Sequence, residues 1–150
     1  MSNKPKIYIF VGSENPKGKT ASFANKLNKI AKKKGFEIAK TVESADGFFI
    51  VSPVHWFSAP IKLKKFIDGK LHRLEEAGWR CEGKLFGALL YSPEGGADLL
   101  LAQLAISANL MGFFIPPFSL LYYRNNNFDM WVFNFEFLDY WKEYLTKFER

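Results

Sequence analysis

Residues 47–60 read GFFIVSPVHWFSAP, and this stretch decides the fold class of the chain. Its first part, Gly47 to Val51, is apolar throughout, which is typical of a β-strand that is covered on both faces. The segment Ala59 to Leu74 has apolar residues at three- and four-residue spacing and predicts an amphipathic helix, with Pro60 near its first turn. A buried strand, a polar turn and a helix in this order indicate a parallel sheet.

The same order of strand, polar turn and helix is found on both sides of residues 47–74. Strands that alternate with helices predict an α/β fold, in which helices cover both faces of a parallel sheet. The other predicted strands are Lys6–Val11, Leu85–Tyr91, one within Phe36–Val42 and one that begins at Phe113–Ile115. The other predicted helices are Lys19–Lys34, Ala97–Met111 and a last helix that Asn134 caps, with Leu138, Trp141, Leu145 and Phe148 as its buried seam.

The composition is that of one globular domain, which we expect to span residues 1–150. The chain has 150 residues, and single domains typically contain about 100–200. Cys81 is the only cysteine, which excludes a disulfide framework and a cysteine-ligated Fe–S cluster. Low cysteine usage, with no apolar targeting segment after Met1, predicts a cytoplasmic location.

The net charge of +6 is concentrated at the start of the chain. Residues 1–40 contain ten lysines against Glu14 and Glu37, a balance of +8, whereas the remaining residues carry 11 basic and 13 acidic side chains, a balance of −2. Such an excess suits a nucleic acid, an anionic ligand or a solvated helix face. Because the exposed aromatics and glycine-rich tails of nucleic-acid binders do not accompany it, no nucleic-acid partner is predicted.

The uncharged segment Leu99 to Tyr123 has 25 residues, which exceeds the ~20 apolar residues that cross a bilayer. Gly112 and the pair Pro116-Pro117 divide it into a helix and a short strand. Each part is too short to cross a bilayer, so no membrane span is predicted.

Three loops rich in glycine, serine or proline follow the predicted strands. Ligands of parallel α/β sheets bind beyond the carboxyl ends of the strands, so these loops are expected to form one rim. They are Gly12–Thr20, Ser52–Ala59 and Ser92–Gly96.

The first loop leads directly into a helix, and such a turn directs backbone N–H groups and the positive helix end at an anion. An ordinary polar turn is the alternative. The ending Gly18-Lys19-Thr20 resembles a nucleotide-binding P-loop, but Gly12 and Gly18 enclose five residues, whereas that motif requires four. No strand ends in an aspartate that would bind Mg²⁺, which argues against a nucleotide triphosphatase.

The second loop places His55, Trp56 and Phe57 between two prolines. Exposed rings in a rim loop suit a flat aromatic ligand or a partner surface; alternatively, Trp56 and Phe57 fold back into the core. In the third loop, Gly95 and Gly96 allow a close backbone approach to a ligand, or form a plain tight turn.

Together these segments resemble the NADPH-dependent FMN reductase branch of the flavodoxin-like superfamily, over about Lys6 to Pro117. The resemblance rests on Gly12–Thr20, on Ala45-Asp46-Gly47 with Ser52-Pro53-Val54-His55-Trp56 and Lys65-Phe66-Ile67-Asp68, and on Tyr91–Gly96. It implies a flavodoxin-like three-layer sandwich with a five-stranded parallel sheet of order 2-1-3-4-5, and FMN bound at the three loops.

By this resemblance, each loop contacts a different part of FMN. The phosphate would be held by Ser13, Asn15, Lys19 and Thr20, and Lys17 and Gly18 of the same loop are also expected to contact the cofactor. The isoalloxazine ring would be lined by Pro53, Val54, His55, Trp56 and Phe57, with Ser92, Glu94, Gly95 and Gly96 on its other side. No residue is assigned as a catalytic acid or base, or as a metal ligand.

The chain departs from the family pattern at several positions. Asn15 stands where arginine is frequent, Lys19 where a small polar residue is frequent, and His55 where tyrosine is common. The lone Cys81 excludes the relatives that carry cysteine clusters. Only Ala39–Asp46 connect the second and third strands, whereas a parallel crossover usually needs about a dozen residues. We therefore expect a short or displaced second strand and a turn in place of the usual helix.

The resemblance implies an enzyme that transfers hydride from NAD(P)H through FMN to a small acceptor. A flavin-binding electron carrier without NAD(P)H turnover and a degenerate scaffold without flavin are the alternatives.

A homodimer or higher oligomer is also predicted, because 14 of the 26 aromatic residues lie between Leu110 and Arg150 and aromatics are enriched in interface cores. They include Tyr122, Tyr123, Phe128, Trp131, Phe133 and Phe135.

Overall fold

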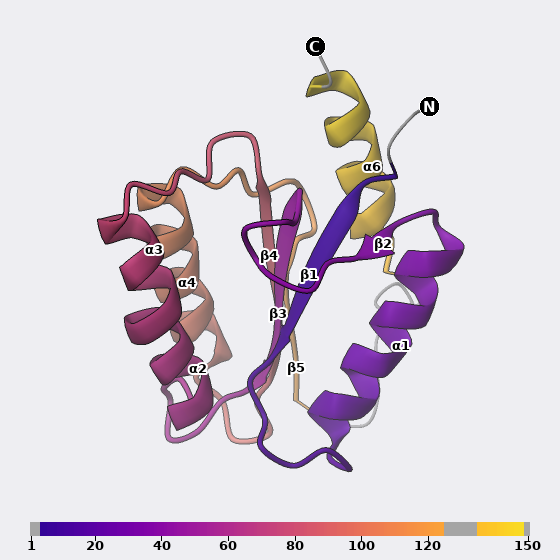
Figure 1. Ribbon diagram of the computed structural model, residues 1–150. Helices are drawn as coiled ribbons and strands as arrows, with labels where there is room; N and C mark the ends of the chain where they lie inside the picture. Colours follow the sequence, from indigo (N-terminus) through magenta and orange to yellow (C-terminus); the bar gives the residue numbers. More distant parts are fainter. Residues whose placement is uncertain (1–3, 125–134, 149–150) are drawn as a thin grey trace.

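The structure is a computed structural model that describes residues 4–124 and 135–148. Its centre is a sheet of five strands in the order β2-β1-β3-β4-β5, as predicted (Figure 1). Every neighbouring pair of strands is parallel. The strands are β1 (Lys6–Val11), β2 (Glu37–Ile38), β3 (Gly47–Pro53), β4 (Leu85–Tyr91) and β5 (Leu120–Tyr123).

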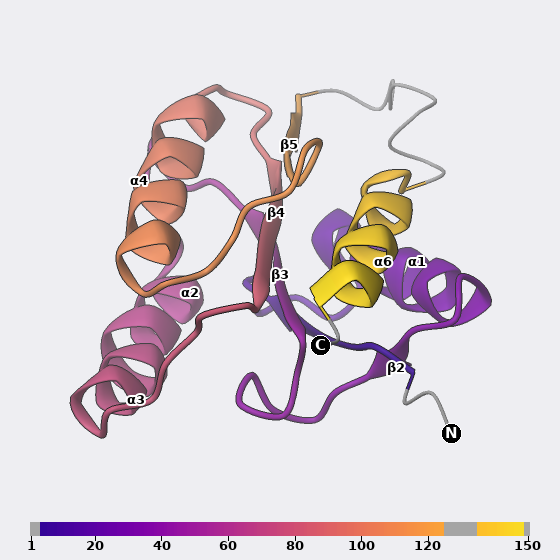
Figure 2. The ribbon, with the colours of Figure 1, turned by 90° about the horizontal axis from the view of Figure 1, so that it is seen from above.

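Helices cover both faces of this sheet, as Figure 2 shows from above. One face carries α1 (Lys19–Lys33) and α6 (Phe137–Phe148). Because helices also cover the opposite face, the predicted three-layer arrangement is confirmed. The other face carries α4 (Ala97–Leu110) and a continuous helix made of α2 (Ile61–Lys65), the π-helical segment η1 (Phe66–Leu71) and α3 (His72–Glu76). The helix predicted from Ala59 begins only at Ile61, because a residue that precedes proline disfavours helical backbone angles.

The buried strand β3 supplies side chains to both layers in alternation. Phe49 and Val51 belong to the apolar cluster between the sheet and the helices α1 and α6. Phe48 and Ile50 belong to the cluster between the sheet and the helices α2 to α4. Because successive side chains of a strand point to opposite faces, a strand between two helical layers must be apolar throughout, which explains the sequence of residues 47–51.

The crossover from β2 to β3 is short, as expected. Only Glu37 and Ile38 of β2 pair with β1, and residues 39–46 form turns without a helix. The last ladder bond at this edge runs from the Ala39 N–H to the Ile7 carbonyl, at 2.9 Å. The strand predicted within Phe36–Val42 is therefore reduced to two residues, since the chain must turn at once to reach the start of β3.

The prediction of a last strand that begins at Phe113–Ile115 is wrong. Phe114 makes only an isolated bridge with Leu85, and its carbonyl accepts the Phe86 N–H at 2.8 Å. The next β4 donor on this side, the Ala88 N–H, binds the Ser119 carbonyl at 2.8 Å. Between these two bonds lies the pair Pro116-Pro117, which has no N–H to contribute to a sheet. The chain therefore leaves the sheet and returns to it as β5.

The C-terminal helix α6 packs against the sheet as predicted. Leu138 and Trp141 are fully buried, and Leu145 packs at the margin of the same cluster. The predicted cap Asn134 and the side chain of Phe148 lie outside the described residues. Within the described ranges, the helices are too short or too polar to cross a membrane.

Candidate functional site

The three predicted loops lie at the same edge of the sheet, beyond the carboxyl ends of β1, β3 and β4 (Figure 1). The Gly12 N–H donates to the Val51 carbonyl at 2.8 Å, and the Val54 N–H donates to the Tyr91 carbonyl at 2.8 Å. A Cβ added at Gly12 would lie 2.3 Å from Oγ of Ser52. Glycine at position 12 therefore permits the first and second loops to pack directly against each other.

The first loop is shaped by its own side chains. Oγ of Ser13 accepts the Asn15 N–H at 3.1 Å, and Oδ1 of Asn15 accepts the Lys17 N–H at 3.0 Å. At the start of α1, the N-cap residue Gly18 makes no side-chain cap, and the first turn contains no acidic residue. Thr20 is buried in this turn. The first N–H groups of a helix and the helix dipole make such a helix start suitable for an anion.

A pocket of about 340 Å³ opens beside the first loop. Lys62, at the start of α2, donates through Nζ to the Ser13 carbonyl at 3.1 Å and brings a positive charge to this pocket. Lys19 lies nearer to the end of β4, with Nζ 5.4 Å from the centroid of the Tyr91 ring. The lining residues of the pocket are Gly12, Ser13, Glu14, Asn15, His55, Pro60, Ile61 and Lys62.

Two predicted cofactor-binding residues of the first loop line a different hollow. Lys17 and Gly18 line a separate hollow of about 400 Å³ on the outer side of α1, together with Lys26 and Lys29. The structure therefore divides the predicted cofactor-binding residues of the first loop: Ser13 and Asn15 line the pocket beside this loop, whereas Lys17 and Gly18 line another one.

The second loop is a two-residue turn with an unusual backbone. The His55 N–H donates to the Ser58 carbonyl at 3.0 Å and the Ser58 N–H donates to the His55 carbonyl at 2.9 Å. Between them, Trp56 and Phe57 have φ angles of +49° and +60°. Two-residue turns with positive φ at both positions strongly favour Asn-Gly or Gly-Gly, and aromatic residues there store strain, which is typical of functional sites.

The rings of this turn project outward. Trp56 is 90% exposed and Phe57 is 57% exposed, so the alternative in which they fold back into the core does not hold. The turn exposes large apolar side chains to water, and its backbone is strained. Both features are typical of a surface that binds a ligand or a partner.

The third loop packs against the second. Gly96 has a φ of +84°, and a Cβ added to it would lie 2.7 Å from Cα of Phe57. Ser92 is fully buried; its N–H donates to the Tyr123 carbonyl at 2.9 Å, and its hydroxyl donates to the Gly95 carbonyl. Ser92 therefore points inward and holds the shape of the loop.

The second and third loops enclose a pocket of about 440 Å³. His55 lines both this pocket and the one beside the first loop, so the two are adjacent. Pro53, the last residue of β3, is half-buried below them. The lining residues are Val54, His55, Trp56, Phe57, Pro93, Glu94 and Gly95.

Sequence reasoning missed several lining residues of the two pockets, chiefly Pro60, Ile61, Lys62 and Pro93. The position of Lys62 could have been predicted. It lies in the first turn of α2, which follows the second loop, and the start of such a helix lies at the same edge of the sheet as the loop. In the part of the chain that the structure describes, no three His, Cys, Asp or Glu side chains gather as metal ligands would.

Solved structures with this fold include several flavoproteins. FerB from Paracoccus denitrificans, a flavoenzyme NAD(P)H:(acceptor) oxidoreductase, superposes with a TM-score of 0.73 at 15% identity, over 95% of this chain and 98% of FerB. A flavodoxin from the domain Archaea gives 0.69 at 14% identity, over 93% and 98% of the two chains. A mutant flavodoxin from Pseudomonas aeruginosa gives 0.69 at 14% identity, over 94% and 99%. These likenesses establish a flavodoxin-like fold.

Among curated protein sequences no match is found. A family-level comparison does find one: the NADPH-dependent FMN reductase family matches residues 37–122, which include β2 to β4, the second and third loops and most of β5. Because this match covers more than half of the chain, the protein belongs to the NADPH-dependent FMN reductase family.

Proposed function

We propose that this protein binds FMN at the three loops and uses it to transfer hydride from NAD(P)H to a small acceptor molecule. The observation that carries the proposal is the turn at Trp56 and Phe57, where two aromatic rings are exposed in a strained backbone beside a pocket. Family membership supports a flavin-dependent oxidoreductase.

The start of α1 fits the phosphate of FMN. Its N-cap residue Gly18 makes no side-chain cap, Thr20 is placed in its first turn, and Lys19 and Lys62 bring positive charge to the loops at this edge of the sheet. Ser13 and Asn15 act mainly by shaping the loop, since both side chains accept backbone N–H groups. A phosphate bound here would interact with the helix dipole and with charged hydrogen-bond donors.

The pocket between the second and third loops fits a flat ring. Trp56 and Phe57 provide aromatic faces, and Gly95 allows the backbone of the third loop to approach closely. Val54, which is buried, and the exposed His55 and Glu94 complete the lining of the pocket. Pro53 and Gly96 contribute indirectly, because they position the two loops.

Bound FMN supplies the chemistry of hydride acceptance and donation at its isoalloxazine ring. The chain's own contribution is to hold that ring, to exclude water from one face and to leave space for a nicotinamide on the other. No side chain in the pocket is assigned a proton-transfer role. A small acceptor would use the same open face after the oxidised nucleotide has left.

Titration of the purified protein with FMN, followed by anaerobic reduction, tests the proposal. We expect FMN to bind, NADPH or NADH to bleach the flavin absorbance within seconds, and air to restore it. If FMN binds and dithionite reduces it but neither nucleotide does, the protein is an electron carrier. If FMN does not bind at all, the chain is a scaffold that does not use flavin, and the proposal is wrong.

A further inference from the structure

The outer edge of β1 is open over the second half of the strand. β2 pairs with β1 only at Lys6 and Ile7, and the last bond at this edge runs from the Ala39 N–H to the Ile7 carbonyl. β1 continues to Val11, but no other described residue pairs with its outer edge beyond Ile7. An unpaired sheet edge presents a row of N–H and C=O groups to which another strand can bind.

The alternation of the backbone identifies the groups that are open. Ile7 directs its carbonyl outward, to the β2 side, whereas Gly12 directs its N–H inward, to the Val51 carbonyl of β3 at 2.8 Å. Because successive residues of a strand form their hydrogen bonds on opposite sides, Ile9 and Val11 point outward like Ile7. We call the main-chain groups of Ile9 and Val11 the open edge.

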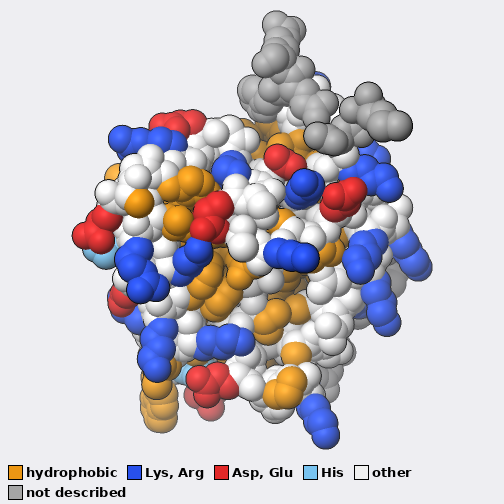
Figure 3. Space-filling model, viewed as in Figure 1, with side chains coloured by type: hydrophobic (Ala, Val, Ile, Leu, Met, Phe, Trp, Pro, Cys, Tyr) orange, Lys and Arg blue, Asp and Glu red, His pale blue; other side chains and the backbone are white. Residues whose placement is uncertain are grey.

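Aromatic rings lie beside the open edge, on the face of the sheet that carries α2 to α4. The Phe66 ring of η1 stacks on Phe10 and Tyr8 of β1, with ring centroids 4.2 and 6.3 Å apart. Tyr8 and Phe66 are only half-buried, because residues 39–46 form turns where a crossover helix normally covers the sheet face. We call these three rings the aromatic strip. Figure 3, in which this side of the sheet faces the viewer, shows hydrophobic side chains exposed between the helices.

Two lysines stand at the ends of this region. Nζ of Lys62 lies 5.9 Å from the centroid of the Phe10 ring. Lys40 is exposed and directly follows Ala39, the last residue that bonds to β1 at this edge. Neither lysine makes an ion pair with a described residue. An acidic ligand would therefore meet two uncompensated positive charges here.

We infer that the open edge binds an extended segment of a partner protein, in which an apolar residue stands between two acidic residues at alternate positions. The main chain of this segment pairs with Ile9 and Val11, which extends the sheet by one strand. Peptides are recognised in this way at exposed sheet edges: the main-chain hydrogen bonds supply affinity and alternate side chains supply specificity.

Strand geometry determines the side chains of the segment. Residues two apart lie on the same face of a strand, about 6.8 Å from each other. An apolar residue over the aromatic strip therefore has one such neighbour near Lys62, at the Phe10 end, and another near Lys40, at the Ile7 end. Acidic side chains at these two positions form charge-assisted hydrogen bonds with the lysines.

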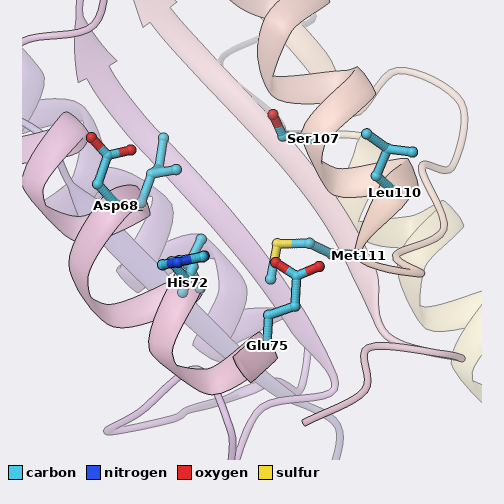
Figure 4. A pocket seen from close by; sticks show the side chains of 8 residues that line it. Asp68, His72, Glu75, Ser107, Leu110 and Met111 are labelled. Carbon is cyan, nitrogen blue, oxygen red and sulfur yellow. The ribbon is translucent and has the colours of Figure 1, made fainter. Parts of the chain in front are cut away.

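Charge disfavours other occupants and other surfaces. A second copy of the chain would bring Lys40 and Lys62 of both copies together at one edge, where like charges repel. The pocket of about 480 Å³ between α4 and the helix of η1 and α3 has Asp68 and Glu75 in its lining (Figure 4), so it does not suit an acidic segment. α1 exposes lysines such as Lys33, but the main-chain groups within a helix are already paired and cannot bind a strand.

The other edge strand of the sheet is β5, where Tyr122 is 49% exposed. It belongs to the aromatic region from which an oligomer was predicted. Tyr123 and Phe135 of that region are buried within their own chain, while Phe128, Trp131 and Phe133 lie outside the described residues. A test of the inference must therefore distinguish β1 from β5, which a substitution within β1 does.

Fluorescence anisotropy of the dye-labelled peptide ETVTETVTE, titrated with the full chain without FMN, tests the inference separately from the proposed function. We expect saturable binding with a dissociation constant on the order of 100 μM or below. The peptide KTVTKTVTK should bind at least about tenfold more weakly, because its charges repel the lysines. Binding that does not saturate, or equal affinity for the two peptides, would overturn the inference.

Val11→Pro tests the main-chain pairing, because it removes an outward N–H at an edge position where a strand tolerates proline. The affinity for ETVTETVTE should fall by about tenfold or more. Val11→Ala is the matched control, since it shortens the same side chain but keeps the N–H, and its affinity should stay near that of the wild type. Circular dichroism checks that both variants are folded. Equal affinities of the two folded variants would contradict pairing at β1.

Lys40→Glu and Lys33→Glu test the charge contribution and do not depend on the fate of the proline variant. Both change the net charge by the same amount, but Lys33 lies on α1, away from the open edge. Lys40→Glu should weaken binding of ETVTETVTE by about three- to fivefold, whereas Lys33→Glu should leave it unchanged. An equal loss in both variants would show a diffuse attraction to the basic chain and would refute a site at the open edge.

Discussion

Cα of Phe57 occupies the space into which a Cβ at Gly96 would project: the two atoms would be 2.7 Å apart, and the Cδ1 atom of the Phe57 ring would be 2.6 Å away. The second and third loops therefore touch through backbone at the mouth of the proposed flavin pocket. Gly96 is also the N-cap of α4 and has a φ of +84°. One residue thus sets the distance between the loops and the start of the helix behind them.

Gly96→Ala is expected to displace the turn at Phe57 and to weaken FMN binding by at least tenfold. The reason is steric, since Cβ contacts below 3.0 Å force a neighbouring group to move. Fluorescence titration with FMN measures the effect. Gly78→Ala is the matched control, because Gly78 has a φ of +81° but nothing lies within 4 Å of its added Cβ. That variant should lose about 1–2 kcal/mol of stability from the left-handed backbone alone and keep its FMN affinity.

Trp56→Gly is expected to affect stability and binding in opposite directions. Glycine adopts a positive φ without the strain that a side chain suffers, so the variant without flavin should be as stable as the wild type or up to about 1 kcal/mol more stable. Loss of the ring should weaken FMN binding by about 1–3 kcal/mol if Trp56 stacks on the flavin. Thermal unfolding and FMN titration measure the two quantities. A large drop in stability would show that the indole is a structural element instead of a ligand contact.

Thr20→Val tests the phosphate site with little change of shape. Thr20 is buried in the uncapped first turn of α1. Loss of a hydroxyl that binds a charged phosphate should weaken FMN binding by about 1.5–3 kcal/mol, roughly ten- to a hundredfold. Riboflavin, which has no phosphate, should bind the variant and the wild type equally. If riboflavin and FMN lose the same affinity, the substitution has damaged the fold of the loop and the phosphate assignment fails.

Glu43→Gln tests an electrostatic contribution away from the site. Nζ of Lys70 donates to the Glu43 carboxylate, and this hydrogen bond is the main reason why the pKa of Glu43 lies below its usual 4.5. A lowered pKa in the folded state means that the contribution to stability is present above pH 4.5 and is lost as the pH falls through the folded-state pKa. Because both side chains are partly exposed, we expect a loss of no more than about 1 kcal/mol at pH 7.

Urea unfolding at pH 7 and pH 3 measures this difference, which should shrink at the lower pH. Glu143→Gln is the control: its ion pair with Lys147 on α6 is more exposed, with 57% and 66% of the two side chains accessible. That substitution should change stability little at either pH. A deficit of Glu43→Gln that is equally large at pH 3 would show that lost packing, and not charge, is responsible.

The sequence patterns by themselves determined the layers of the fold, and the family resemblance implied the order of the strands in the sheet. Residues 6–11, 47–51 and 85–91 are apolar runs between helical patterns, and each of these signals is local to its own segment. The same local reasoning placed three loops at one edge, because the connectivity of a parallel sheet puts every strand-to-helix turn on that side. It also anticipated the short second crossover, since only residues 39–46 are available to make it.

Only the tertiary structure decided how these segments meet. The positive φ angles of Trp56 and Phe57 could not be predicted, because such a turn normally requires glycine or asparagine and is held here by contact with Gly96, far away in the sequence. The position of β5 also depended on contacts between distant segments. Pro116 and Pro117 interrupt the pairing with β4, and the chain pairs again only where the Ala88 N–H donates to the Ser119 carbonyl. Local patterns record which residues are buried, whereas backbone strain, pocket boundaries and register arise from contacts between distant segments, and these exist only once the chain has folded.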